Sequence, residues 1–177
     1  MDSTKRKFTS REKLYKWLCY SALLFVLYIF QSVGLMPEIF GTRPSFLLAA
    51  PVCIAICEGA LPGAVTGAVC GILIDTIQPG LDGFFSFFLV ILCGLTGMLV
   101  ISVMRNTIIT ALFLSSVSVI TVKLSEWFFF VWFAEVDKTA FRFVNYTLPS
   151  MFYTVLMTAP VYFLVLWIKS KFDVIKD

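Results

Sequence analysis

The sequence predicts an all-α, polytopic integral membrane protein, a helical bundle with about six transmembrane helices. Of its 177 residues, 59% are apolar and only 14% are charged, and the mean hydropathy is +0.92. Soluble domains carry about 25% charged residues, so an ordinary water-soluble globule is excluded. The apolar residues also gather into six runs separated by short polar segments, which is typical of a chain that crosses a membrane repeatedly.

These six apolar runs are the expected helices. A helix needs about 20 mostly apolar residues to cross a hydrocarbon core about 30 Å thick, and the first, fourth, fifth and sixth runs satisfy this requirement. The second run is short, contains Pro51, and would reach only about 21 Å at 1.5 Å per residue. It crosses with the help of residues 42–58, lies tilted, or enters and leaves on the same side. The six expected spans are residues 17–35, 44–57, 60–77, 84–104, 107–134 and 147–168.

Basic residues set the expected orientation, because Lys and Arg in short loops favour the cytoplasmic side. Ten of them fall on the side that both termini share, three fall in the opposite loops, and Lys123 lies inside a span. Two cytoplasmic termini require an even number of crossings, which agrees with six. We therefore expect a cytoplasmic basic segment 1–16, a transmembrane domain 17–168 and a cytoplasmic tail 169–177. The ten are Lys5, Arg6, Lys7, Arg11, Lys13, Lys16, Arg105, Lys169, Lys171 and Lys176, and the three are Arg43, Lys138 and Arg142.

Aromatic residues at the ends of the first and last spans agree with this frame. Tyr15, Trp17 and Tyr20 open the first span, and Trp167 closes the sixth beside a lysine. Trp and Tyr collect at membrane–water interfaces, so we expect these residues to act as interfacial anchors. The basic segment 1–16 is too short and too polar to fold alone, and we expect a disordered or interfacial start that lies against anionic lipid headgroups.

A glycine series in the third run is the most informative pattern. Gly59, Gly63, Gly67 and Gly71 recur at every fourth position, and Asp75 takes the next step. Residues four apart share one helix face. The series therefore predicts a groove without side chains, along which another helix backbone can approach closely.

Two uses of this groove stay open at the level of sequence. It packs against a helix of the same chain, or it docks a helix from another membrane protein or from a second copy in a homodimer. Gly94 and Gly97 form a smaller counterpart of the series in the fourth run. The regular spacing indicates close helix packing, and it does not identify the helix that packs there.

Three charged residues stand where the chain is otherwise apolar. Lys123 and Glu126 lie three residues apart in the fifth run, and Asp75 lies near the end of the third. A charge in mid-membrane costs about 2.5–3.5 kcal/mol even on the lenient insertion scale, so we expect Lys123 and Glu126 to pair. Alternatively, the three residues contribute to partner contacts or to a polar cavity open to the outer side. The further residues expected at such a cavity are Arg43, Asp82 and Arg142.

Catalytic and cofactor patterns are lacking in the sequence. The chain has no histidine, which removes His-based acid–base pairs, triads and metal sites, and it has no nucleophile elbow, phosphate loop or zinc spacing. We therefore expect no enzymatic activity, no cofactor and no nucleic-acid partner. All five cysteines fall in spans. Cys53 and Cys57 share a helix face, and they either pack as small apolar residues or form a soft-metal site.

A series of residues between positions 40 and 100 carries a family likeness: Arg43-Pro44, Glu58-Gly59, Gly63, Gly67, Gly71, Ile72-Leu73-Ile74-Asp75, Gly83 and Gly94. This stretch resembles MreD, the rod shape-determining membrane protein of the bacterial elongation machinery. Its specific part is the glycine series that ends in Asp75 and is followed by Gly83. Ser45 stands where the family commonly has an acidic residue after the proline, so the resemblance assigns no role to that position.

The resemblance implies a non-enzymatic scaffold that binds a bitopic, MreC-like membrane protein. It also implies a rod complex with the glycosyltransferase RodA, its class B penicillin-binding protein and MreB filaments. Such a complex directs lateral peptidoglycan synthesis and cell shape from the bacterial cytoplasmic membrane. The family resembles in fold the six-helix S components of energy-coupling-factor transporters, so the rival expectation is a substrate-binding carrier subunit. A carrier pocket needs several polar groups, and the outer half offers few beyond Asn145, Tyr146 and Thr147; this favours the scaffold.

Overall fold

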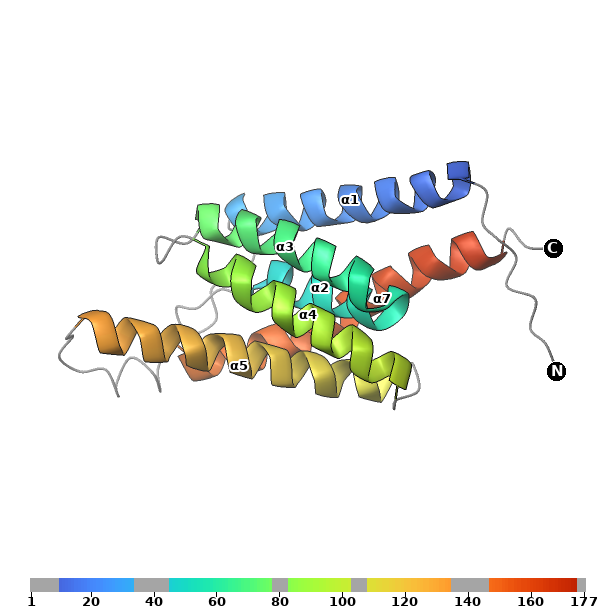
Figure 1. Ribbon diagram of the computed structural model, residues 1–177. Coiled ribbons are helices and arrows are strands. Elements are labelled where there is room, and N and C mark those ends of the chain that lie inside the picture. Colours follow the sequence, from blue (N-terminus) through green and yellow to red (C-terminus); the bar gives the residue numbers. More distant parts are fainter. Residues whose placement is uncertain (1–9, 34–44, 78–82, 103–107, 135–146, 175–177) are drawn as a thin grey trace.

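The computed structural model describes residues 10–33, 45–77, 83–102, 108–134 and 147–174, and these form six helices. The helices are α1 (Ser10–Val33), α2 (Phe46–Glu58), α3 (Ala60–Ile77), α4 (Phe84–Ser102), α5 (Ile108–Ala134) and α7 (Leu148–Val174). Consecutive helices run antiparallel, so that α1 begins and α7 ends at one end of the bundle (Figure 1). We call this the terminal end, and we call the end where α3 is followed by α4 the opposite end.

The expected fold class is confirmed. Within the described ranges every regular element is a helix, and four helices (α1, α3, α5 and α7) are long and apolar enough to cross a membrane. The described apolar parts of α2 and α4 are shorter than this requirement, so the number of crossings stays a prediction. The second to fifth expected spans agree with α2 to α5 to within two residues at each end.

The first and last helices extend beyond the apolar spans that the sequence defines. α1 begins at Ser10, seven residues before the expected start, and α7 continues to Val174, six residues past the expected end. The expected boundaries at residues 16/17 and 168/169 therefore fall inside continuous helices, and where the membrane ends along these two helices stays a prediction. Lys, Arg and Glu are good helix formers, and adding a residue to an existing helix costs far less than starting a new one.

α2 is the central helix of the bundle (Figure 1), and it contacts α1, α3, α4, α5 and α7. Every residue from Phe46 to Cys57 is buried. A helix that is apolar on all sides must be surrounded by other apolar groups, and here those groups belong to the same chain. With 13 residues, α2 is about 20 Å long. Because protein covers its whole circumference, its length does not have to match the thickness of the lipid.

The first turn of α2 depends on its neighbours for hydrogen-bond partners. The opening N–H groups of a helix have no acceptor within the helix. The N–H of Leu47 donates to Oε1 of Gln31 on α1 at 3.2 Å, and the N–H of Ser45 donates to Oγ1 of Thr154 on α7 at 3.3 Å. Side chains of α1 and α7 thereby supply hydrogen-bond acceptors for the buried N–H groups at the start of α2.

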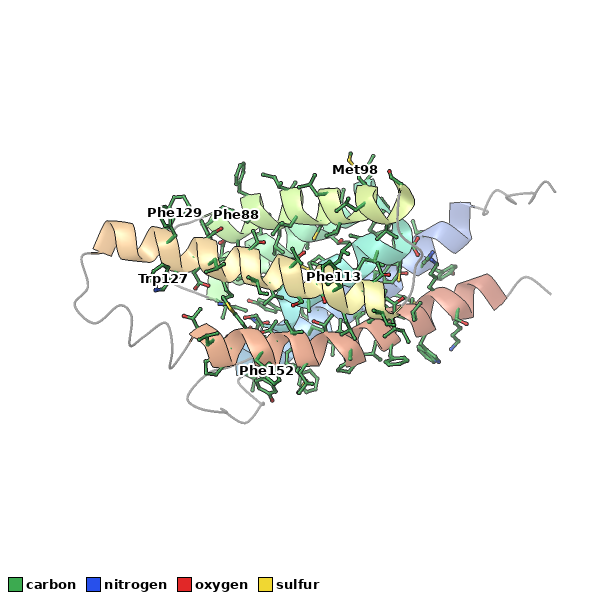
Figure 2. All side chains as sticks on the ribbon, turned by 90° about the horizontal axis from the view of Figure 1, so that it is seen from below. Phe88, Met98, Phe113, Trp127, Phe129 and Phe152 are labelled. Carbon is green, nitrogen blue, oxygen red and sulfur yellow. The ribbon has the colours of Figure 1, made fainter. Side chains whose placement is uncertain are left out.

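The outer surface of the bundle is an apolar belt contributed by every helix except α2. Met98 and Phe152 point away from the bundle on opposite sides, and Phe113 lies on the outside of α5 (Figure 2). α1 is the most peripheral span: 11% of its apolar window is buried, compared with 33–39% for α3, α5 and α7. Its inward stripe consists of Tyr20, Leu24 and Leu27, and the rest of its apolar surface is available to lipid.

Candidate functional site

The glycine series lies against α2 and α4 of the same chain. A Cβ atom added at Gly67 would lie 2.8 Å from the carbonyl O of Leu89, and one at Gly71 would lie 2.6 Å from the backbone N of Ser86. A Cβ atom at Gly63 would overlap the side chain of Ala55 on α2. Because these contacts are with backbone or with the short side chain of a buried helix, the three positions leave no room for any residue larger than glycine.

The two glycines of α4, Gly94 and Gly97, lie in different environments. A Cβ atom at Gly97 would lie 2.5 Å from the backbone N of Ala60 and 2.7 Å from the carbonyl C of Gly59, whereas one at Gly94 would meet only the Cβ of Ala64 at 3.9 Å. Gly59 itself ends α2 with φ 105°, a left-handed conformation that favours glycine. Of the two uses left open for the face of Gly63, Gly67 and Gly71, the structure shows packing within the chain, because α4 and α2 occupy this face.

Asp75 caps the start of α4. Its Oδ1 atom accepts a hydrogen bond from the N–H of Phe85 at 3.1 Å, and its Oδ2 atom accepts from the N–H of Ser86 at 3.3 Å and from the Ser86 hydroxyl at 2.7 Å. A carboxylate at a helix N-terminus satisfies N–H groups that lack partners and interacts favourably with the helix dipole. Asp75 thus does for α4 what a local capping residue does elsewhere, although it comes from the preceding helix.

Lys123 and Glu126 form the ion pair that their spacing predicts. The Nζ atom of Lys123 lies 2.7 Å from Oε2 of Glu126, and the side chains are 10% and 23% exposed. Lys123 lies on the buried side of α5, one turn from Val119. Burial of a single ammonium group is costly, and the carboxylate one turn further along the helix offsets that cost.

The structure does not join these two polar groups into one site. Within the described residues, no hydrogen bond or ion pair links Asp75 to Lys123 or Glu126. Both groups lie toward the opposite end, where an aromatic contact of 5.5 Å between the ring centres of Phe84 and Phe129 connects α4 to α5. The remaining residues expected at an outer cavity, Arg43, Asp82 and Arg142, lie outside the described residues.

A polar junction at the terminal end was not predicted from the sequence. Glu58, the last residue of α2, accepts a hydrogen bond from the Tyr20 hydroxyl at 3.0 Å and forms an ion pair with Lys16 at 2.5 Å. The Lys16 and Glu58 side chains are only 13% and 19% exposed. Lys169 approaches the same turn from α7, and its Nζ atom donates to the carbonyl O of Cys57 at 2.7 Å.

A signal for this terminal junction was present in the sequence. Glu58 follows fourteen residues without a charge, and an acidic group beside such a run needs a cationic partner. The positions of Lys16 and Lys169 in the sequence indicate an orientation and a nearby headgroup layer, but they do not indicate contact with α2. Sequence separations of 42 and 112 residues hid the fact that both reach the last turn of α2.

Four of the five thiols and several hydroxyl groups lie in the interior. Cys53, Cys57, Cys70 and Cys93 are buried free thiols within the hydrophobic core. Among the described residues, no group of three or more His, Cys, Asp or Glu side chains is placed to hold a metal ion. Buried hydroxyls also line α5 and α7, and each donates to a carbonyl of its own helix. They are Ser115, Ser118, Thr154 and Thr158.

Comparison of the chain with known protein families, curated proteins and solved structures finds no match. The polar and close contacts described above hold helices together: backbone contact at the glycine series, a carboxylate cap at Asp75, and ion pairs at Glu58 and Lys123.

Proposed function

We propose that this chain is a non-enzymatic membrane scaffold of the MreD kind, which binds a single-span, MreC-like membrane protein in the bacterial cell-elongation complex. The main support is what the residues that carry the resemblance do. Glu58 joins α2 to α1, Gly63, Gly67 and Gly71 pack α3 against α2 and α4, and Asp75 caps α4. They thereby stabilise one compact unit whose outer surface is apolar, as a scaffold for other membrane helices requires.

The proposed location is the bacterial cytoplasmic membrane, with six crossings and both termini in the cytoplasm. The excess of basic residues near the termini, ten against three, supports this orientation. The antiparallel order of the helices, with the start of α1 and the end of α7 at the same end (Figure 1), agrees with an even number of crossings.

The partner helix, in this proposal, lies against the outside of the bundle. The glycine series is occupied within the chain, so the exposed apolar faces of the peripheral helices are the surfaces left for a partner. Further rod-complex components, the glycosyltransferase RodA, a class B penicillin-binding protein and MreB filaments, would be reached through that partner or directly. Asp75 contributes by fixing the start of α4, and Glu126 by fixing Lys123 on α5.

One observation favours the rival function, a substrate-binding subunit of an energy-coupling-factor type transporter. Buried hydroxyls on α5 and α7, together with Lys123, place polar groups between helices of the bundle. A ligand pocket needs such convergent polar groups. Each hydroxyl that donates to its own helix still has an oxygen that can accept a hydrogen bond from a ligand.

Co-expression with a candidate MreC-like protein, followed by purification in mild detergent, separates the two functions. The scaffold function predicts a stoichiometric complex that unfolds at a higher temperature than the chain alone, because a partner that binds only the folded state stabilises it. Asp75→Asn and Glu126→Gln should weaken this complex without preventing membrane insertion. Co-purification with an ATPase module of the ABC type, or retention of one small molecule per chain, would instead establish the carrier.

A further inference from the structure

Two lysines at the end of α7 point in opposite directions. The Nζ atom of Lys169 donates to the carbonyl O of Cys57 at 2.7 Å, so this side chain is directed into the bundle. Lys171 lies two residues further along, about 200° around a helix with 3.6 residues per turn. It is exposed, and its Nζ atom lies 5.0 Å from the centre of the Trp167 ring.

The Trp167–Lys171 pair lies where the apolar span of α7 ends. This span covers Leu148–Lys171, and Trp167 is 62% exposed near its end. The span of α1 begins with Leu14 at the same end of the bundle (Figure 1), and Trp17 is also exposed there. Because Trp side chains favour the membrane interface, we expect the ring and the ammonium group to lie at the level of the lipid headgroups.

The charges that surround the pair favour an anionic ligand. Among the described side chains at the terminal end, three lysines accompany one carboxylate, that of Glu58, which already holds Lys16. Lys169 is bound to a backbone carbonyl. Lys171 is directed away from the bundle, and the face of the Trp167 ring holds its ammonium group there. That group has three N–H donors, so it can still donate to an oxygen of a ligand.

We propose that Trp167 and Lys171 bind the headgroup phosphate of an anionic phospholipid. The ammonium group of Lys171 donates to a phosphate oxygen, and the ring of Trp167 contacts the glycerol region below it. Phe163 and Leu164, one turn earlier on the same face of α7, are exposed and contact the first acyl carbons. A zwitterionic lipid binds less well, because its own cation competes for the phosphate and repels Lys171. This site does not depend on the proposed scaffold function.

Native mass spectrometry of the full chain, purified in detergent and mixed with phosphatidylglycerol and phosphatidylcholine, tests the proposal. The wild-type chain should retain phosphatidylglycerol preferentially. Lys171→Gln should lower this preference about fivefold, the effect of one surface lysine on attraction to an anionic membrane. Lys171→Arg should keep the preference, and Trp167→Leu should reduce retention of phosphatidylglycerol. Each side chain is exposed, so the variants are expected to fold.

Lys169→Gln is the matched control, because it removes the same charge from the same end of the bundle but from a side chain directed inward. It should leave the preference within about twofold of wild type. If Lys171→Gln keeps the full preference, or if Lys169→Gln loses as much, there is no site at Lys171 and the proposal is wrong. Soluble glycerol phosphate should not displace the lipid at equal concentration; displacement would mean that the site takes free phosphate compounds, which overturns a lipid site.

Discussion

The Ser86 hydroxyl donates a hydrogen bond of 2.7 Å to Asp75, and the backbone N–H of Ser86 donates to the same carboxylate oxygen at 3.3 Å. The carboxylate that caps the first turn of α4 therefore belongs to α3, ten or eleven residues earlier in the chain. This contact and the glycine packing beside it, where Gly71 adjoins the Ser86 backbone, hold α3 and α4 together as one antiparallel pair.

Replacement of Asp75 should destabilise the start of α4. Asp75→Ala removes the cap and should cost about 1–2 kcal/mol of unfolding free energy, while Asp75→Asn keeps one acceptor oxygen and should cost less. Ser86→Ala loses only the hydroxyl and should cost about 1 kcal/mol. Hydrogen exchange of the amides of residues 85–88 in detergent measures the effect. Unchanged exchange in Asp75→Ala would show that the cap does not stabilise this turn.

The glycine contacts can be tested with single methyl groups. Gly67→Ala and Gly71→Ala should each destabilise the bundle by about 1–3 kcal/mol, because the added Cβ atom meets the α4 backbone and forces the helices apart. Gly94→Ala is the matched control, since a Cβ atom there has room and alanine favours a helix by up to about 1 kcal/mol. Thermal unfolding of the three variants in one detergent gives the comparison. Equal melting temperatures would rule out close packing at Gly67 and Gly71.

The Lys123–Glu126 pair should be more sensitive to the loss of one partner than to the loss of both. Glu126→Gln leaves a buried ammonium group without its carboxylate and should cost about 2–3 kcal/mol, somewhat below the cost at a fully buried pair because Glu126 is partly exposed. Lys123→Met combined with Glu126→Leu should lie within about 1 kcal/mol of wild type. Unfolding temperatures of the single and double variants decide the matter. A double variant as unstable as Glu126→Gln would contradict this account.

At the terminal end, Lys16 and Glu58 should be energetically coupled. Each of Lys16→Gln and Glu58→Gln removes the same ion pair, so the double variant should be destabilised by less than the sum of the single changes. Because α1 is the most peripheral span, the loss should also raise hydrogen exchange within α1 before it affects α5. Strictly additive effects would mean that the ion pair does not hold α1 to α2.

Labelling from each side of the membrane tests the orientation. A cysteine added at either end of the chain should react with a membrane-impermeant maleimide only after the membrane is opened, because both termini are expected in the cytoplasm. The native thiols at positions 53, 57, 70 and 93 are buried and should contribute little background, and Cys19, which is only partly buried, is replaced by serine. Reaction of either terminus in intact cells would contradict the proposed topology.

Composition, the lengths of the apolar runs and residue spacing were sufficient to predict the fold class, the bounds of four of the six helices to within two residues, and the Lys123–Glu126 pair. Each of these depends on residues close together in the chain. A long run of apolar residues in lipid satisfies its backbone hydrogen bonds within the run by forming a helix, and a spacing of three places two charges on one helix face. The glycine series likewise predicted close helix packing, because a spacing of four places the glycines on one face of their own helix.

The tertiary structure decided which helices fill each of these positions. The sequence could not show that α4 and α2 occupy the glycine face, that Asp75 caps a different helix, or that Lys16 and Lys169 both reach the end of α2. Nor could it show that the shortest helix is the central one. The physical reason is that apolar contact and hydrogen bonding are satisfied by any suitable neighbour, and only the packing of the whole bundle selects one.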